Sequence, residues 1–400
     1  MPSKIRESPL PSPLSFLDKV ANLEKEQGRM IIRFDLAEPQ FSPPKAAIEG
    51  TIAALRDGRF RYSPSRGLPE LIDAIKTYLR ETRGLQYGER EVLVTTGGKF
   101  ANYAFFSSLF RKGDGVVLLK PYWTSFAAVP EMLGLKKYEV WSDAPYHLNS
   151  DLLLEAMTKR PKAIVVNTPN NPTGGILNGD DIKLLCNLAT DYDLWVLSDE
   201  IDWAYTFDGR KHISPASLAE LRDRAIVTDG FSKVFSMTGW RVGFAAGPKG
   251  VIEKMHSIQE HSISSPTTFA QWGCVEAIKS SREYIADMLK KCSLKRLSVM
   301  KTLKTIATLD CPLPEGGFYV YPRVLDRGSK GSLTFCEELL RHGGVSVIPG
   351  SMFGDTRATF RLCYAVSDDL LDEGMKRLVK YFNSKTGAKK SKKEKMNEAM

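Results

Sequence analysis

The stretch AIVVNTPNNPTGGILNGDDIKLLCNLATDYDLWVLS, residues 163–198, decides the fold class. It starts with the short apolar run Ala163–Asn167 and passes through a turn that contains two prolines and a glycine. The amphipathic segment Asp180–Asp191 follows, and the apolar run Leu194–Ser198 ends the stretch. Two buried strands joined by a crossover helix are the repeating unit of a parallel sheet. The stretch therefore predicts an α/β domain.

The same alternation continues on both sides of this stretch. Further strands are predicted at Val92–Thr95, Val116–Leu119, Ala225–Thr228 and Val242–Ala246. Further helices are predicted at Lys99–Arg111, Thr124–Leu133, Asp151–Lys159 and Val251–His261. Because helices alternate with strands, the sheet should be mostly parallel and covered on both faces. We expect this large domain to span residues 43–280.

The pattern changes beyond residue 280, where a smaller α+β domain is expected over residues 281–384. Its predicted helices are Arg282–Ala307, Leu333–His342 and Asp368–Phe382, and its predicted strands are Gly316–Pro322, Val345–Ile348 and Thr359–Tyr364. The proline-rich segment 1–42 should pack along this domain. Residues 385–400 hold six lysines and two glutamates and are expected to be a disordered basic tail.

Composition excludes several other classes of protein. The 400 residues are 42% hydrophobic and 26% charged, which is ordinary for a globular protein. No apolar run reaches the roughly 18–20 residues of a membrane span, and no signal peptide is evident, so we expect a cytoplasmic protein without a membrane partner. The six cysteines are scattered without a C-x-x-C pair, so neither a disulfide framework nor a metal site is expected. Much of the net charge of +9 lies in the lysine tail, which argues against a nucleic-acid partner.

The strongest chemical signal is the segment from Ser232-Lys233 to Gly239-Trp240-Arg241, which follows the predicted strand Ala225–Thr228. A lysine amine can condense with an aldehyde, and a serine with an arginine can hold a phosphate at a fixed distance. The alternative is a lysine and an arginine that lie solvated in a surface turn.

Two more signals stand at the carboxyl ends of predicted strands, where open α/β sheets bind ligands. Asn171 follows the strand Ala163–Asn167 and offers an amide donor to a ligand oxygen. Asp199 follows the strand Leu194–Ser198, and its carboxylate can pair with a protonated ring nitrogen. The alternatives are an ordinary Asn-Pro turn for Asn171 and a helix cap or surface acid for Asp199.

Three weaker signals complete the set. The Gly97-Gly98-Lys99 turn joins a strand to a helix, where backbone amides can bind a phosphate. Trp123 follows another strand and can stack on a cofactor ring, or simply pack in the core. Arg361 lies in a predicted strand and can bind a carboxylate with both arms of its guanidinium, or form an ordinary ion pair.

Together with the Glu38-Pro39 region and the run Tyr62-Ser-Pro-Ser-Arg-Gly67, these motifs resemble the class I pyridoxal-phosphate-dependent aminotransferases of fold type I. Within that family the likeness is to the bacterial and archaeal aspartate aminotransferase branch. It runs from about Arg6 to Phe382. The resemblance implies a large domain with a seven-stranded sheet, a small domain and a homodimer with shared sites.

The resemblance also implies a role for each matching residue. Lys233 would bind the cofactor aldehyde and then move the proton, Asp199 would pair with the ring nitrogen, and Asn171 would donate to the phenolic oxygen. Trp123 would stack on the ring and contact substrate. Tyr62 would reach the phosphate bound by the neighbouring subunit, and Arg361 with Ala37 would bind the substrate α-carboxylate. The phosphate ligands would be Gly98, Lys99, Ser232 and Arg241.

On substrate, the Gly-Gly-Lys motif of this branch implies dicarboxylic substrates, so aspartate with 2-oxoglutarate as acceptor is expected. Three positions depart from the family: Asp202 replaces a tyrosine beside the cofactor, Ala37 replaces glycine, and Phe100 replaces a polar residue. A carboxylate at position 202 disfavours a neighbouring phenolate. The alternatives are a β-lyase, a decarboxylating or oxidative enzyme on the same fold, an aminotransferase for aromatic or other neutral amino acids, and a cofactor-binding regulatory protein.

Overall fold

The computed structural model describes residues 15–28, 30–325 and 331–398. The described chain separates into two compact units. Unit 1 holds residues 41–290 and 315–317, and unit 2 holds the described residues of 11–40, 291–314 and 318–400. Among the described residues, no helix is both long and apolar enough to cross a membrane.

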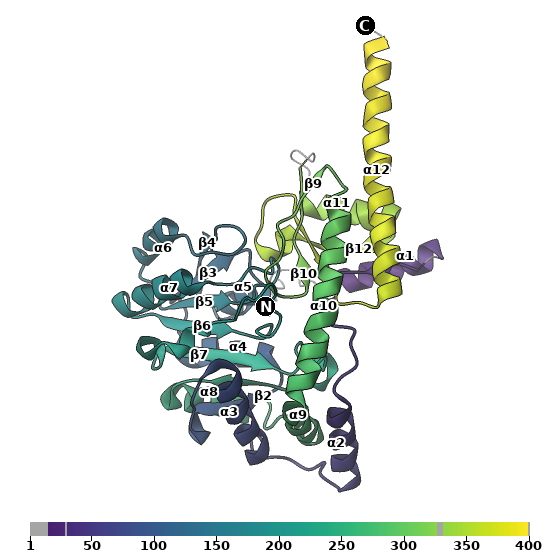
Figure 1. Cartoon of the computed structure of the whole chain (residues 1–400). Coiled ribbons are helices and arrows are strands. Elements are labelled where there is room, and N and C mark those ends of the chain that lie inside the picture. The colour runs from purple at the N-terminus through teal and green to yellow at the C-terminus, as the bar shows by residue number, and fades with distance from the viewer. Residues whose placement is uncertain (1–14, 29, 326–330, 399–400) are drawn as a thin grey trace, which may run out of the picture. The chain divides into compact units, whose positions relative to one another are not determined.

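Unit 1 is built on a seven-stranded sheet with the strand order β2-β8-β7-β6-β5-β3-β4 (Figure 1). Strand β8 is antiparallel to both of its neighbours, and all the other pairs are parallel. The prediction of a mostly parallel α/β sheet is confirmed. In sequence order the strands are β2 (Val92–Thr95), β3 (Gly115–Lys120), β4 (Lys136–Trp141), β5 (Ala163–Asn167), β6 (Trp195–Asp199), β7 (Ala225–Gly230) and β8 (Gly243–Ala246).

The sheet is buried on both faces, which explains why its central strands are continuous apolar runs. On one face, Leu118 and Leu197 share a hydrophobic core with Phe105, Phe126 and Met255 from three different helices. On the other face, alternate strand residues such as Val117, Ile164 and Val196 are also fully buried. The sheet therefore presents only its edges and its strand ends to ligands.

Two helices of unit 1 begin at side-chain caps. Helix α7 starts with a reciprocal capping box between Asn178 and Asp181, and α6 starts with a hydrogen bond from the backbone of Leu152 to Asn149. The helices are α2 (Lys45–Arg56), α3 (Pro69–Arg83), α4 (Gly98–Leu109), α5 (Ser125–Met132), α6 (Ser150–Met157), α7 (Gly179–Asp191), α8 (Lys249–Ser262) and α9 (Thr268–Lys279).

Strand β4 and helices α2, α3 and α9 are absent from the elements predicted from sequence. Strand β4 has the sequence KKYEVW and lies at the edge of the sheet, next to β3 alone. Because an edge strand is partly solvated, it contains polar residues and lacks the continuous apolar run by which the central strands are recognised.

Unit 2 contains short strands and long helices. Helix α10 (Ser281–Leu303) leads into it from unit 1. Strand β1 (Ile32–Arg33) pairs in parallel with β12 (Val345–Ser346), and β14 (Phe360–Cys363) pairs with β10 (Tyr319–Val320) and β13 (Ile348–Pro349). The other elements are α1 (Ser15–Gln27), β9 (Leu309–Asp310), β11 (Arg323–Val324), α11 (Ser332–Glu338) and α12 (Asp368–Glu398).

Two predictions for unit 2 need correction. The single strand expected at Val345–Ile348 is two strands, because β12 pairs with β1 while β13 pairs with β14 in a different sheet. The segment 385–400, expected to be disordered, continues helix α12 as far as Glu398 (Figure 1). Lysine, alanine, glutamate and methionine favour helix, and extending an existing helix is far less costly than starting one.

Candidate active site

Asn171 and Asp199 are joined through a residue that sequence reasoning missed. Asn167 ends β5 directly opposite Asp199, which ends β6. The side-chain amide of Asn167 donates to the Asp199 carbonyl at 3.1 Å, and its oxygen accepts from the Asn171 backbone N–H at 2.8 Å. One buried amide therefore fixes the turn that carries Asn171 against the strand that carries Asp199.

The Asp199 carboxylate is buried, with 5% of the residue exposed. Asn102 of α4 donates to Oδ2 of Asp199 at 2.8 Å, and the backbone N–H of Ile201 donates to Oδ1 at 3.2 Å. Burial raises the pKa of Asp199 to about 6, although these two hydrogen bonds act in the opposite direction. The group is thus poised to be an anion at neutral pH, and a cation placed beside it would be strongly favoured.

Lys233 lies in the loop after β7, the strand that neighbours β6. The Lys233 carbonyl accepts hydrogen bonds from the Tyr205 hydroxyl at 2.9 Å and from the Ser236 backbone at 3.2 Å. On either side of it, the buried rings of Phe231 and Phe235 stack with their centroids 5.4 Å apart. The loop that carries Lys233 is therefore anchored by its backbone and by its aromatic residues.

Two glycines, Gly97 and Gly243, allow close approaches at the start of α4. Gly97 has φ +77°, and a Cβ added to it would lie 2.5 Å from Nη2 of Arg241. A Cβ on Gly243 would lie 2.4 Å from the backbone nitrogen of Gly98. A side chain at position 97 would collide with the Arg241 guanidinium, and one at position 243 would collide with the backbone at the start of α4. Helix α4 also has no side-chain cap at its first turn, so its N–H groups remain available to an anion.

The polar groups around this turn form what we call the anion cradle: Thr96, Gly98, Lys99, Ser232 and Arg241. Within the described part of the chain, the buried Thr96 hydroxyl and the Ser232 hydroxyl have no hydrogen-bond partner. Neither Lys99 nor Arg241 is paired with a carboxylate there. Partial burial of the Lys99 ammonium, followed by the charge of Arg241, lowers the pKa of Lys99. The Arg241 guanidinium, the two hydroxyls and the backbone N–H groups of a helix N-terminus suit a phosphate.

Trp123 lies beside the anion cradle. The ammonium nitrogen of Lys99 is 5.0 Å from the centroid of the Trp123 ring, a cation–π contact. Phe126 supports Trp123 edge-on, with the ring centroids 5.4 Å apart. The ring is only partly buried, so it is available for stacking.

Arg361 and the segment that carries Ala37 meet within unit 2. Arg361 lies on β14 with 2% exposure, and its Nη2 donates to the Asp35 carbonyl at 2.7 Å, two residues before Ala37. The guanidinium also lies over the rings of Tyr319 and Phe353, at 5.1 and 5.2 Å from their centroids. These contacts hold the guanidinium in one orientation, as bidentate binding of a carboxylate requires.

Asp202 and Tyr62 have contrasting surroundings. Asp202 is 1% exposed, and its carbonyl accepts from the Tyr205 backbone at 2.9 Å. Tyr62 is 89% exposed and lines a surface pocket with Phe60, Arg61 and residues 265–269. Tyr62 therefore lies at the surface of unit 1, whereas Asp202 lies inside it.

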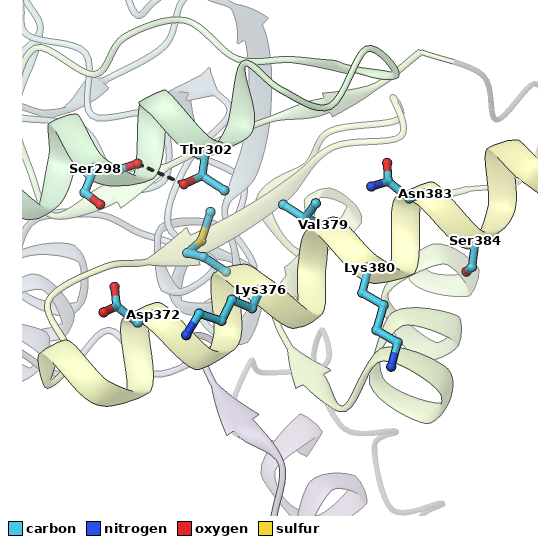
Figure 2. Close-up of a pocket in the computed structure, with 9 residues that line it drawn as sticks. Ser298, Thr302, Asp372, Lys376, Val379, Lys380, Asn383 and Ser384 are labelled. Carbon is cyan, nitrogen blue, oxygen red and sulfur yellow. Dashed lines mark hydrogen bonds between the residues drawn. The ribbon is translucent and has the colours of Figure 1, made fainter.

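A larger groove lies in unit 2 between α10 and α12, with a volume of about 790 Å³. Figure 2 shows that Lys376 and Lys380 extend from α12 while Ser298 and Thr302 come from α10. The Thr302 hydroxyl already donates to the Ser298 carbonyl at 3.2 Å. No residue predicted to belong to the site lines this groove.

Residues 29–378 match the family described as Aminotransferase class I and II. The chain belongs to this family. It is thus an enzyme that transfers amino groups, and its family uses pyridoxal 5′-phosphate. The resemblance inferred from the motifs is confirmed.

Named relatives of this aminotransferase share most of its length. A probable aspartate/prephenate aminotransferase of Aquifex aeolicus is 34% identical, over 92% of this chain and 95% of the relative. The structure of the Thermus thermophilus aspartate aminotransferase with maleate has a TM-score of 0.87 at 32% identity, covering 93% of this chain and 97% of that one. An aromatic aminotransferase from Pyrococcus horikoshii has a TM-score of 0.86 at 32% identity, covering 92% and 99%.

Two residues of this aminotransferase, Asn102 and Asn167, hold the site together and were missed from the sequence. Asn167 is the last residue of an apolar strand, so the sequence pattern marks it as the end of that strand and gives no sign of its hydrogen-bonding role. Asn102 lies in a helix whose other buried residues are alanine and phenylalanine. A lone polar residue among apolar neighbours in a helix is a usable signal, since burying it without a partner is costly.

Proposed function

We propose that this aminotransferase moves the amino group of an aspartate-like amino acid to a 2-oxo acid such as 2-oxoglutarate. The observation that carries the proposal is Lys99. Its ammonium lies over Trp123, with no carboxylate partner in the described chain, and burial lowers its pKa. A second carboxylate on the substrate would supply the missing anion. Relatives named for aspartate support the same choice.

Pyridoxal 5′-phosphate, when bound, supplies an aldehyde and an electron-withdrawing ring. The Lys233 amine would hold the aldehyde carbon with loss of water and, once a substrate amine has replaced it there, would accept the α-proton of the substrate as a free base. Asp199 would pair with the protonated ring nitrogen, and Asn171 would donate to the phenolic oxygen. Trp123 would stack on the ring, and the anion cradle would hold the phosphate.

Arg361 is proposed to bind the α-carboxylate of the substrate, with the backbone of Ala37 assisting. The support lies in the restrained guanidinium, which has one arm on the Asp35 carbonyl and two aromatic rings beneath it. A restrained arginine loses little rotamer freedom on binding, so more of the interaction energy is left for affinity.

The direct test is to add aspartate to the purified protein loaded with pyridoxal phosphate, first without and then with 2-oxoglutarate. The visible absorbance band is expected to move to the near-ultraviolet with aspartate alone and to return when 2-oxoglutarate is added. Release of ammonia without need of an acceptor would instead indicate a β-lyase, and protein that binds no cofactor would contradict the proposal.

Replacing Lys99 with alanine is expected to lower kcat/KM for aspartate by roughly tenfold to a hundredfold, the value of one charge-assisted hydrogen bond. When the substrate is L-alanine, which has no second carboxylate, kcat/KM should change far less. Steady-state kinetics on both substrates measures this selectivity. Lys99→Arg keeps the cation and serves as the control. An equal loss on both substrates would assign Lys99 to the cofactor phosphate alone.

Two further parts of the proposal are a cytoplasmic location and a homodimer in which Tyr62 of one subunit reaches the phosphate bound by the other. Support for the dimer comes from exposed apolar side chains on α2 and just after it. Ile48, Ile52 and Leu55 are 40%, 42% and 43% exposed at helical spacing, and Phe60 is 64% exposed. Sedimentation equilibrium should give the mass of two chains.

A second candidate is an aminotransferase for aromatic amino acids, favoured by the solved aromatic aminotransferase of similar structure. Phenylalanine and tyrosine in the same spectral assay separate it from the first candidate.

Asp202 is proposed to lie beside the cofactor. A substitution of Asp202 by tyrosine, followed by absorbance titration, tests whether this carboxylate retunes the site.

A further inference from the structure

Asn102 is a polar side chain at the centre of an apolar helix. It lies on α4 with 3% exposure, between the buried residues Ala101 and Ala104 and one turn before Phe106. A buried amide costs free energy unless its donors and acceptor are satisfied. Its partners therefore indicate what it does.

Those partners come from two neighbouring strands. Asn102 Nδ2 donates to Asp199 Oδ2 at 2.8 Å, and the Thr228 hydroxyl donates to Asn102 Oδ1 at 2.8 Å. Asp199 on β6 and Thr228 on β7 also face each other in the sheet register. All three residues are at most 5% exposed, so water does not replace these bonds.

The chemistry of the groups fixes the direction of this chain of hydrogen bonds. An ionised carboxylate only accepts, so the amide must turn its NH₂ towards Asp199. Its carbonyl oxygen then faces Thr228, and the hydroxyl must donate to it. Thr228 thereby satisfies the amide oxygen in the orientation that turns the NH₂ group towards Asp199, the one that favours a negative charge there.

Other charges near Asp199 act against that negative charge. Burial has the largest effect and raises the pKa of Asp199 to about 6, while the carboxylates of Asp229 on β7 and Glu200 after β6 raise it further. The Tyr146 hydroxyl is a neutral group that also faces Asp199, and burial raises the pKa of Tyr146. The Ile201 backbone N–H is the second donor to the carboxylate. Asn102 is thus one of two donors that offset desolvation and like-charge repulsion.

We propose that Asn102 and Thr228 are positioning residues that keep Asp199 ionised and hold its carboxylate plane fixed towards the cofactor ring nitrogen. The part about the ring nitrogen rests on the proposed function. The effect on Asp199 itself does not, because the hydrogen bonds form within the protein. Asn102 and Thr228 touch neither cofactor nor substrate in this proposal and act through Asp199.

The experiment measures proton binding by Asp199 in the cofactor-free protein. Aspartate labelled with ¹³C at the side-chain carboxyl is incorporated, and the Asp199 signal is assigned by its loss in Asp199→Asn. We expect Asn102→Leu to raise the proton affinity of Asp199 roughly tenfold or more, the effect of one lost charge-assisted hydrogen bond. Thr228→Val should raise it less, because the amide remains but is free to turn. Ser108→Ala, on the same helix and bonded only to the Phe105 carbonyl, is the matched control and should leave it unchanged.

An unchanged Asp199 titration in a folded Asn102→Leu protein would overturn the proposal. If Asn102→Leu does not fold, Thr228→Val is tested in its place. An unchanged Asp199 titration in Thr228→Val would then overturn the proposal. In the loaded enzyme, the acid limb of the kcat–pH profile should move to higher pH in step with the cofactor-free titration. A shifted Asp199 titration together with an unchanged kcat–pH profile would support the effect of Asn102 and Thr228 on Asp199. It would count against the role proposed for Asp199 at the ring nitrogen.

Discussion

Replacing Lys233 with alanine is expected to reduce kcat for transamination by on the order of 10⁴-fold or more, since this one side chain is proposed to provide both the covalent bond to the cofactor and the proton transfer. The loop should keep its shape, because it is anchored through the Lys233 carbonyl to Tyr205 and Ser236, and these bonds do not involve the lysine side chain. The variant should still bind pyridoxal phosphate, without a covalent link.

Stopped-flow absorbance and product assays measure this loss. Lys249→Ala, at the exposed start of α8, is the matched control and should keep the full rate. Added small amines should restore part of the Lys233→Ala activity, because they can carry the proton that the lysine carried. A Lys233→Ala enzyme that kept a tenth of the wild-type rate would remove Lys233 from the proposed mechanism.

Replacing Arg83 with methionine is expected to lower the free energy of unfolding by about 3–5 kcal/mol. The Arg83 side chain is 1% exposed, forms an ion pair with Asp229, and lies 3.2 Å from Glu200. Burial alone would raise the pKa of Glu200, but His212 and Arg83 outweigh it and lower this pKa to about 2. Without the guanidinium, two buried carboxylates would be left with a single cationic partner at most, which is the costly case.

Urea unfolding at several pH values measures the cost. Burial raises the pKa of Asp229 to about 6, above that of an unfolded aspartate, so its ionisation lowers stability as pH rises through that range. The cost of Arg83→Met should therefore be larger at pH 8 than at pH 5, and Asp229→Asn should recover part of it. Arg210→Met, which breaks a half-exposed pair with Glu315, should cost less than about 1 kcal/mol. A small, pH-independent cost for Arg83→Met would contradict this account.

The fold class could be predicted, and most residues of the candidate site could be proposed, because both depend on local sequence patterns. Apolar runs such as Ala163–Asn167 mark strands that are buried on both faces, and the turns after them carry the chemistry. Glycine and proline in these turns are there because the backbone needs them, as the contact between Gly97 and Arg241 demonstrates. Strand β4 was not predicted from the sequence, because an edge strand is half solvated and lacks the continuous apolar pattern.

What the sequence by itself determined is therefore the class of fold, the order of the central strands and their crossover helices along the chain, and the family to which the motifs belong. Only the tertiary structure decided that Asn102, Asp199 and Thr228 meet, although they lie far apart in sequence. It also decided that Arg83 pairs with both Asp229 and Glu200 in the core. The physical reason is that periodicity reports which face of an element is buried, whereas hydrogen-bond and ion-pair partners depend on which elements become neighbours in space.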